Sequence, residues 1–317
     1  MLTRRQSLTL GTAAVFAPLL PFPALAAPQA DWGSIEYLPE VTSAHVGPRA
    51  VTLWQPPADV VPLDEPLPVI VAQDGGNLFD AAASYSGTAW ELDRAMQAHI
   101  EKGGQAARIV AVHSGAARSM EYNSETVLAA LDGEMADLVL RSCEGPLASN
   151  AYLRFLAEEL LPMAAGRMAL AQGPAMILGA SMGGTIAVEA LMTRPDVFAA
   201  GAALSAHLVL FGPASQAPDF GPFPEDGGKR LAAAWRKAAA AHFPAPGGTR
   251  LWLDRGTEDL DAFYPDSHIA LTESLLAKGY VAGDDLMVRV DKGAGHFETF
   301  WQARLPAVLD FLLPAKG

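Results

Sequence analysis

The strongest constraint on the fold is a glycine-rich turn in the middle of the chain. Residues 179–183 read GASMG, the pattern G-x-S-x-G, and they lie between an apolar run and a helical pattern. In this strand-to-helix turn the serine backbone is strained and the flanking positions need little or no side chain. The turn lifts the hydroxyl above the sheet, beside the positive end of the helix. We therefore predict that Ser181 is a nucleophile and that the Met182 N–H donates to an oxyanion. The alternative is a glycine-rich turn with an idle serine.

Short apolar runs alternate with helical patterns along the rest of the chain. The runs cover residues 51–54, 69–72, 108–112, 175–178, 199–204, 250–253 and 286–290. Helical spacing of apolar residues occurs at 90–100, 152–168, 183–192, 229–241, 267–277 and 299–313. This alternation predicts an α/β fold with a mostly parallel sheet and helices on both faces. In such sheets functional side chains gather at the carboxyl ends of the strands.

The first 26 residues have the pattern of an export signal. Arg4 and Arg5 precede an apolar stretch at 8–20, and ALA at 24–26 fits a cleavage site. The arginine pair resembles a twin-arginine signal, although such pairs also enter the general export route. We predict a signal peptide at 1–26, one domain at 27–317 and a periplasmic or secreted protein. The alternative is an uncleaved membrane anchor, but the stretch is short and interrupted by prolines. We therefore expect no stable membrane insertion after cleavage.

Composition and charge exclude several classes of function. The chain is 50% hydrophobic and 18% charged, which excludes a disordered protein. Its net charge of −13 argues against nucleic acid as a partner. The single cysteine, Cys143, excludes a disulfide within the chain, and no histidine pair has metal-ligand spacing. We therefore predict no metal, while the oligomeric state stays open.

A serine nucleophile needs a base, and four histidines follow Ser181 in the sequence. His296 follows the last predicted strand in the loop GAGHF, so we predict that it is the base, with a structural imidazole as the alternative. His207 follows another strand end and is expected to line the pocket. His242 lies at a helix end and His268 at an acidic helix start, and we expect both at the surface.

The acid that orients the base should lie in the carboxylate-rich loop after the strand 250–253. We favour Asp259, three residues past Gly256, and keep Asp261 and Glu258 as alternatives. Asp254 ends the strand and is expected to cap or turn the chain. If all these carboxylates are solvated, Ser181 and His296 would act as a dyad.

Two other segments are candidate parts of the site. The loop QDGGN at 73–77 should supply a second oxyanion donor, for which we favour the N–H of Gly76 over that of Gly75. Its alternative is a simple turn. The segment 205–230 is rich in Phe and Pro and lacks a period, so we predict a lid or pocket wall rather than an inert surface loop. Trp90, His207 and Phe211 are the predicted substrate-binding residues.

Several stretches resemble an esterase family of α/β-hydrolases. This family includes siderophore (enterobactin-type) esterases, S-formylglutathione hydrolase, feruloyl esterases and mycolyltransferases. The similarity spans roughly residues 36–312. It is carried by SAHVGPR at 43–49 before VTLWQP at 51–56, DGGNLFD at 74–80, Trp90, Arg118 with EY at 121–122, YLRFLAEELLP at 152–162, and GHFE at 295–298 with Trp301 and Arg304.

The resemblance implies an α/β-hydrolase fold and cleavage of carboxylic esters without a cofactor. By position it supports Ser181 as nucleophile, His296 as base, and the amides of Gly76 and Met182 as oxyanion donors. Gly76 stands where glutamine is common in the family, and family members vary in the acid loop. The implied substrate is a small-molecule or oligosaccharide ester, such as a siderophore ester or an acylated sugar or feruloyl ester. An acyltransferase with the same acyl-enzyme and a catalytically silent binding protein are the alternatives.

Overall fold

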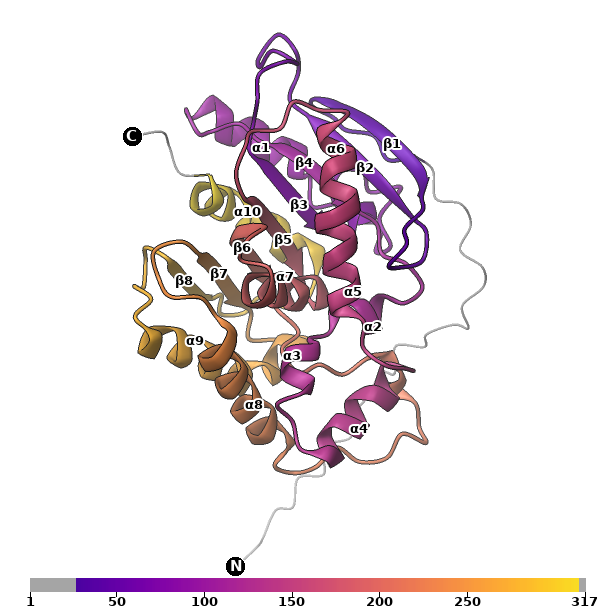
Figure 1. The fold of residues 1–317 in the computed structure, drawn as a ribbon, viewed down its shortest axis with the longest axis vertical. Helices are drawn as coiled ribbons and strands as arrows, with labels where there is room; N and C mark the ends of the chain where they lie inside the picture. The colour runs from indigo at the N-terminus through magenta and orange to yellow at the C-terminus, as the bar shows by residue number, and fades with distance from the viewer. Residues whose placement is uncertain (1–26, 314–317) are drawn as a thin grey trace, which may run out of the picture.

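The computed structural model describes residues 27–313, and the predicted signal peptide lies outside these residues. Eight strands form one sheet in the order β1-β2-β4-β3-β5-β6-β7-β8 (Figure 1). The strands are β1 (Ser34–Val41), β2 (Arg49–Gln55), β3 (Val69–Gln73), β4 (Arg108–Val112), β5 (Ala175–Ala180), β6 (Phe198–Leu204), β7 (Arg250–Arg255) and β8 (Leu286–Val290). All seven predicted strands are present, as β2 to β8.

The sheet is parallel from β4 to β8, and its carboxyl ends share one edge. β3 pairs in parallel with β4 and β5, and β5 to β8 continue the parallel pairing, whereas β1 and β2 are antiparallel to their neighbours. Ala180, the last residue of β5, pairs with Leu204, the last of β6. The predicted mostly parallel α/β sheet is therefore confirmed.

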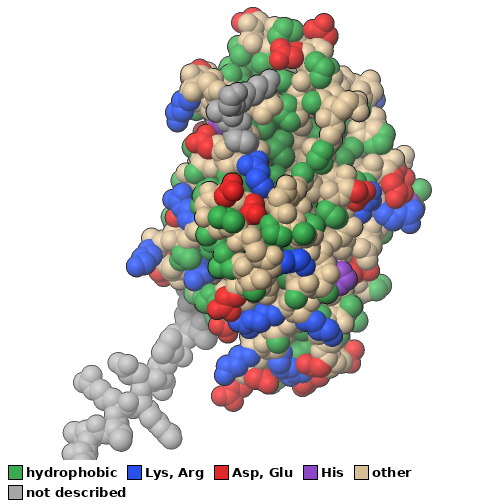
Figure 2. Space-filling model, turned by 60° about the vertical axis from the view of Figure 1, so that its left-hand side comes forward, with side chains coloured by type: hydrophobic (Ala, Val, Ile, Leu, Met, Phe, Trp, Pro, Cys, Tyr) green, Lys and Arg blue, Asp and Glu red, His purple; other side chains and the backbone are tan. Residues whose placement is uncertain are grey.

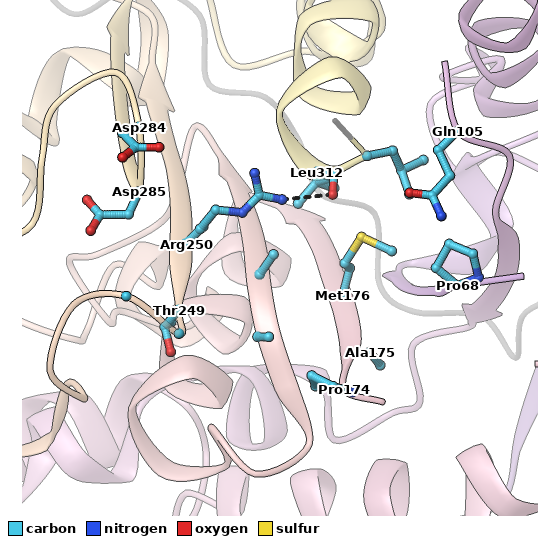
Figure 3. Close-up of a pocket in the computed structure, with 15 residues that line it drawn as sticks. Pro68, Gln105, Pro174, Ala175, Met176, Thr249, Arg250, Asp284, Asp285 and Leu312 are labelled. Carbon is cyan, nitrogen blue, oxygen red and sulfur yellow. Dashed lines mark hydrogen bonds between the residues drawn. The ribbon is translucent and has the colours of Figure 1, made fainter. Parts of the chain in front are cut away.

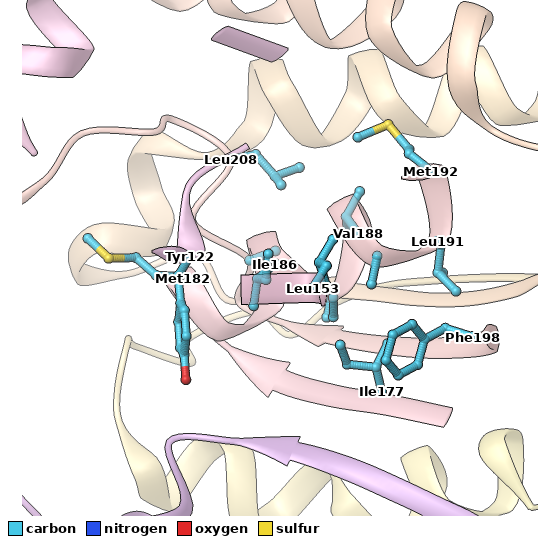
Figure 4. Packing of buried hydrophobic residues seen from close by; sticks show 14 of the residues in the cluster. Tyr122, Leu153, Ile177, Met182, Ile186, Val188, Leu191, Met192, Phe198 and Leu208 are labelled. Atoms are coloured by element: carbon cyan, nitrogen blue, oxygen red, sulfur yellow. The ribbon is translucent and has the colours of Figure 1, made fainter. Parts of the chain in front are cut away.

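Helices cover both faces of the sheet (Figure 1). They are α1 (Leu92–Glu101), α2 (Arg118–Tyr122), α3 (Glu125–Leu128), α4 (Gly133–Ser142), α5 (Ser149–Arg154), α6 (Leu161–Ala165), α7 (Met182–Thr193), α8 (Gly227–His242), α9 (Pro265–Lys278) and α10 (Glu298–Leu312). α1 and α10 bury apolar side chains on one face, and α4 to α9 pack on the other. Figure 4 shows part of this second core, where Ile186 and Val188 of α7 lie near Ile177 and Phe198 of the sheet.

The sequence patterns missed β1 and the short helices between β4 and α5. β1 is an edge strand in which partly buried positions are interspersed with exposed ones, so it has no continuous apolar run. The helical pattern at 152–168 is one helical stretch with a π-helical segment, η2 (Phe155–Leu160), between α5 and α6. No helix in the described part of the chain is long and apolar enough to cross a membrane.

Candidate active site

Ser181 stands at the sharp turn between β5 and α7. Its backbone has φ 55° and ψ −127°, a strained conformation for a residue with a side chain. The turn is so tight that a Cβ on Gly179 would lie 2.2 Å from the carbonyl oxygen of Gly183. Glycine is therefore required at 179 by backbone contact. Met182 begins α7, where N–H groups have no partner one turn earlier in the helix, so its amide is available to a ligand.

The predicted oxyanion turn lies directly against this elbow. Gly76 is in the short 3₁₀ helix η1 (Gly75–Asn77), which follows β3, the neighbour of β5. A Cβ on Gly183 would meet the Gln73 side chain at 3.1 Å and the Asp74 carboxylate at 3.2 Å. The structure thus brings the ends of β3 and β5 together, with Gly76 three residues past the end of β3 and Met182 two residues past the end of β5.

Arg118 joins these two segments. Its Nε and Nη2 each donate to a carboxylate oxygen of Asp74 at 2.7 Å, and its Nη1 lies 3.3 Å from Sδ of Met182. Asp74 itself has a left-handed backbone with φ 55°. A two-pronged bond from the planar guanidinium holds this carboxylate more firmly than a single contact would. Arg118 therefore fixes the turn that carries Gly76.

His296 bonds to the carboxylate of Asp261. Its Nδ1 lies 2.6 Å from Oδ1 of Asp261, whose side chain is fully buried. The other oxygen, Oδ2, accepts from Ser205 Oγ at 2.7 Å and from the N–H of Gly256. Burial would raise the pKa of Asp261, but hydrogen bonds from His296, Ser205 and Gly256 outweigh it and hold the pKa below the usual value. Asp261 is therefore an ionised partner for the imidazole.

This geometry favours Asp261 over Asp259, the residue preferred from the spacing. The loop winds into a 3₁₀ helix, η4 (Asp259–Phe263), which leaves Asp259 and Glu258 exposed and buries Asp261. Asp259 has φ 52°, and its side chain borders the backbone of Gly295. Counting from Gly256 could not show which carboxylate contacts His296, because the winding of η4 depends on contacts with residues distant in the sequence.

His207 lies between Ser181 and a buried tyrosine. The backbone N–H of His207 donates to the backbone carbonyl of Ser181 at 2.9 Å. In its ring, Nε2 donates to the Phe211 carbonyl at 2.8 Å. Since a carbonyl only accepts, Nδ1 is left to accept from the Tyr264 hydroxyl at 2.8 Å. Burial lowers the pKa of His207 to about 4, so the ring is neutral. With both ring nitrogens bonded, His207 is not free to act as a base.

Tyr264 completes a path of contacts from Ser181 to His296. Its ring meets the His296 ring edge-on, with centroids 5.7 Å apart. Ser181 and His296 therefore share the carboxyl edge of the sheet, linked through His207 and Tyr264. The sequence patterns gave no signal for Tyr264, because its place depends on how η4 and α9 pack.

The remaining histidines differ in their outcome. His242 is exposed at the end of α8, as expected. The expectation for His268 was wrong: it is 4% exposed, and its Nε2 donates to the Ala206 carbonyl at 2.8 Å. Burial lowers the pKa of His268 to about 4. The acidic residues near the start of α9 suggested a surface position, but the side of α9 that carries His268 faces the loop after β6.

The predicted substrate-binding aromatics lie at different depths. Trp90 is buried, and the centroid of its ring lies 5.7 Å from that of Trp301. The Trp301 ring in turn meets the His296 ring edge-on, with centroids 5.1 Å apart. Trp90 therefore supports His296 through Trp301.

Phe211 packs edge-on against Phe220 and Phe223, with ring centroids 6.3 and 4.7 Å apart. These three side chains form an aromatic cluster in the segment 205–230.

Two surface cavities lie outside this constellation. The first, about 520 Å³, is at the amino ends of β3, β5, β6 and β7, where Arg250 donates to the Leu312 carbonyl (Figure 3). The second, about 510 Å³, is lined by residues 289–294 together with Phe300, Ala303 and Arg304. Ser181 and His296 line neither of them. Ser181, which follows the carboxyl end of β5, therefore lies at the opposite edge of the sheet from the first cavity.

The described residues present no metal centre and a mixed surface. Within 27–313, no group of three or more His, Cys, Asp and Glu side chains could hold a metal ion. Figure 2 shows acidic, basic and apolar side chains interspersed over the described part of one face.

Comparisons with known proteins identify a family for the chain. Residues 47–312 match the model of a family described as "Putative esterase". A search of curated proteins gave no match.

Solved structures with the same fold include a ferulic acid esterase, with 18% identity and a TM-score of 0.57 over 90% of this chain and 100% of that chain. The enterobactin esterase FES from Shigella flexneri has 18% identity and a TM-score of 0.57 over 92% of this chain and 62% of that one. The siderophore hydrolase EstB from Aspergillus nidulans has 16% identity and a TM-score of 0.56, covering 90% of this chain and 96% of that one.

The family match covers most of the chain, and the fold is that of the α/β-hydrolases. The chain therefore belongs to the "Putative esterase" family and is a carboxylic ester hydrolase.

Proposed function

We propose that this protein is an exported serine esterase that cleaves carboxylic esters through Ser181, His296 and Asp261. The observation that carries the proposal is the 2.6 Å bond between His296 and the buried Asp261, at the same sheet edge as the strained Ser181. A nucleophile, a base and an orienting acid are the three roles that such hydrolysis needs.

In the proposed reaction, Ser181 Oγ attacks the ester carbonyl carbon while Nε2 of His296 accepts the hydroxyl proton. The N–H groups of Gly76 and Met182 donate to the negatively charged oxygen of the tetrahedral intermediate. His296 then protonates the leaving alcohol, which leaves an acyl group on Ser181. Water, deprotonated by the same imidazole, attacks this acyl-enzyme. The bond between the acyl carbon and Ser181 Oγ then breaks, His296 returns the proton to Oγ, and the acid is released. Removal of one oxyanion donor in such sites costs about 10²–10³-fold in turnover.

Asp261 supports this cycle by holding one tautomer of His296. Its ionised carboxylate accepts from Nδ1–H, so Nε2 is left without a proton and can act as the base. The same negative charge stabilises the imidazolium that forms during attack. Asp261 is therefore assigned as the acid in place of Asp259.

The proposed substrate is a small-molecule or oligosaccharide ester, either a siderophore ester or an acylated sugar or feruloyl ester. The aromatic cluster of Phe211, Phe220 and Phe223 supports an apolar or aromatic group near the site. The names of the structural neighbours, a ferulic acid esterase and siderophore hydrolases, are consistent with such esters.

Export is proposed from the first 26 residues. Their basic start, apolar stretch and ALA motif support cleavage and release into the periplasm or the medium. Mass spectrometry of the secreted or periplasmic protein should find a mature N-terminus at Ala27. An intact N-terminus in a membrane fraction would contradict this.

Covalent labelling tests the nucleophile. A serine-directed fluorophosphonate should label the wild type and the control Ser274→Ala, whose hydroxyl bonds within α9. Ser181→Ala should take up no label and should cleave no nitrophenyl ester, while its melting temperature stays close to that of the wild type. Unlabelled wild-type protein would favour a silent binding protein.

Product analysis then separates hydrolysis from acyl transfer. Siderophore, feruloyl and acetyl-sugar esters should release free acid. A dominant transesterified product in the presence of an added alcohol would favour the acyltransferase.

A further inference from the structure

We propose that Ser205, oriented by the buried Arg304, is a positioning residue that sets the carboxylate of Asp261 against His296. This inference rests on the proposed function, because it concerns how the acid of that site is held. Ser205 directly follows β6, and Arg304 lies in the middle of α10. These two residues come from segments that are far apart in the sequence, and they meet beside Oδ2 of Asp261, the carboxylate oxygen that does not contact His296.

The direction of the hydrogen bonds follows from the chemistry of the three groups. Ser205 Oγ lies 2.7 Å from Oδ2 of Asp261 and 3.0 Å from Nη1 of Arg304. Arginine can only donate, so the hydroxyl oxygen accepts from Arg304 and its single proton points to Asp261. Arg304 thereby selects one rotamer of the hydroxyl proton. All three residues are at most 2% exposed, so water does not compete for these bonds.

The backbone of Ser205 is held by the same arginine through Asp254. The N–H of Ser205 donates to Oδ1 of Asp254 at 2.9 Å, and Nη1 of Arg304 donates to the same oxygen at 2.6 Å. Trp252 Nε1 donates to the other oxygen at 2.7 Å. Ser205 has φ 41°, a left-handed conformation that needs such support in a residue with a side chain.

The charge of Arg304 is already balanced without Asp261. Its Nη1 bonds to Asp254, and its Nε lies 2.7 Å from Oδ2 of Asp291. One guanidinium therefore faces two carboxylates, and Arg289 also reaches Asp291 at 2.5 Å. Arg304 acts on Asp261 through the Ser205 hydroxyl and not as its direct counter-ion.

This arrangement determines which oxygen faces the base. Oδ2 of Asp261 takes two donors, Ser205 Oγ and the Gly256 N–H, which leaves Oδ1 for His296. Without the Ser205 proton, the carboxylate is more basic and less fixed in rotation. A carboxylate that can rotate holds Nδ1–H of His296 less firmly, so the imidazole is less well oriented for catalysis.

The test uses Ser205→Ala and a matched control, Ser124→Ala. Ser124 is also a buried serine, whose Oγ donates to a carboxylate, that of Glu189, at 2.6 Å and accepts from the Val127 N–H at 2.9 Å. Both variants lose one buried hydroxyl–carboxylate bond, but only Ser205 touches the acid. We expect Ser205→Ala to lower kcat/KM by about 10-fold or more, the loss seen when outer partners that orient a functional histidine are removed. Ser124→Ala should alter the melting temperature alone.

A double-mutant cycle tests the role of Arg304. Arg304→Lys keeps a positive charge near Asp254 and Asp291 but loses the planar fork that reaches Ser205. If Arg304 acts through Ser205, adding Arg304→Lys to Ser205→Ala should cause no further loss of kcat/KM. Additive losses would overturn this link.

A spectroscopic readout decides the inference independently of turnover. The Nδ1 proton of His296, bonded to Asp261, should give a far-downfield proton resonance in the wild type. Ser205→Ala should move or abolish this resonance, and Ser124→Ala should leave it unchanged. An equal response of both variants would refute a positioning role for Ser205. A wild type that cleaves no ester would refute the proposed function, while this resonance would still decide the role of Ser205.

Discussion

Replacing Asp261 by asparagine should inactivate the enzyme by reversing the tautomer of His296. In the wild type, Oδ2 of Asp261 accepts from Ser205 Oγ and the Gly256 N–H. An asparagine has one acceptor oxygen, and it must occupy this place, because an NH₂ group there would face two donors. The NH₂ group would then point at Nδ1 of His296, which would have to accept. The ring proton would move to Nε2, the nitrogen that should take the proton of Ser181.

The size of the effect follows from the loss of the base. The wrong tautomer in a serine triad lowers kcat by about 10⁴-fold. At about 1.4 kcal/mol for each factor of ten, this is about 5–6 kcal/mol of transition-state stabilisation. Asparagine keeps the shape of the buried side chain, so the variant should still fold.

The assay compares Asp261→Asn with Asp259→Asn. Asp259 is exposed and has φ 52°, a conformation that asparagine tolerates well. Initial rates with a nitrophenyl ester should fall about 10⁴-fold for Asp261→Asn and change by less than about twofold for Asp259→Asn. Circular dichroism and thermal melting check that both variants are folded.

The opposite pattern would refute this reasoning. If Asp259→Asn lost the activity and a folded Asp261→Asn kept it, the acid would be the residue favoured by the loop spacing. If both variants stayed active, Ser181 and His296 would act as a dyad.

Three further predictions follow from the same structure. Gly179→Ala places a Cβ 2.2 Å from the Gly183 carbonyl oxygen and should lower the free energy of unfolding in urea by more than about 3 kcal/mol. In the control Gly47→Ala, the added Cβ meets open space, so this free energy should change little. Equal effects of the two substitutions would argue against a tight turn at Ser181. Arg118→Met frees Asp74 and the oxyanion turn, so kcat should fall by about 10- to 100-fold, and a change in KM alone would contradict this role. His268 has a pKa of about 4 in the folded protein, below its usual 6.5. The unfolded chain therefore takes up a proton first as the pH falls, so the contribution to stability is complete above about pH 6.5 and decreases between 6.5 and 4, by up to about 3 kcal/mol. His268→Gln should flatten this part of the urea stability curve, and an unchanged slope would contradict the assignment.

Local patterns were sufficient for most of the fold. Strands buried on both faces need continuous apolar runs, and each of the seven runs predicted as strands is a strand of the sheet. The amphipathic helices were equally visible, because each buries one face against the sheet. The patterns missed β1 because an edge strand needs no such run, and they missed α2 and α3 because helices of five and four residues are too short to show a period. Length does not explain why α4, with ten residues, was missed.

The sequence by itself determined where Ser181 lies, because G-x-S-x-G between a strand and a helix predicts a tight strand-to-helix turn with the serine at its centre. It also pointed to His296, Gly76 and Met182, since all follow strand ends. Only the tertiary structure decided which carboxylate reaches His296, because η4 turns Asp261 inward against Ser205 and Gly256. The same holds for Arg304, whose partners Asp254, Ser205 and Asp291 come from three different segments. Contacts between distant segments leave no local pattern, so burial and hydrogen bonding in the folded chain select these residues.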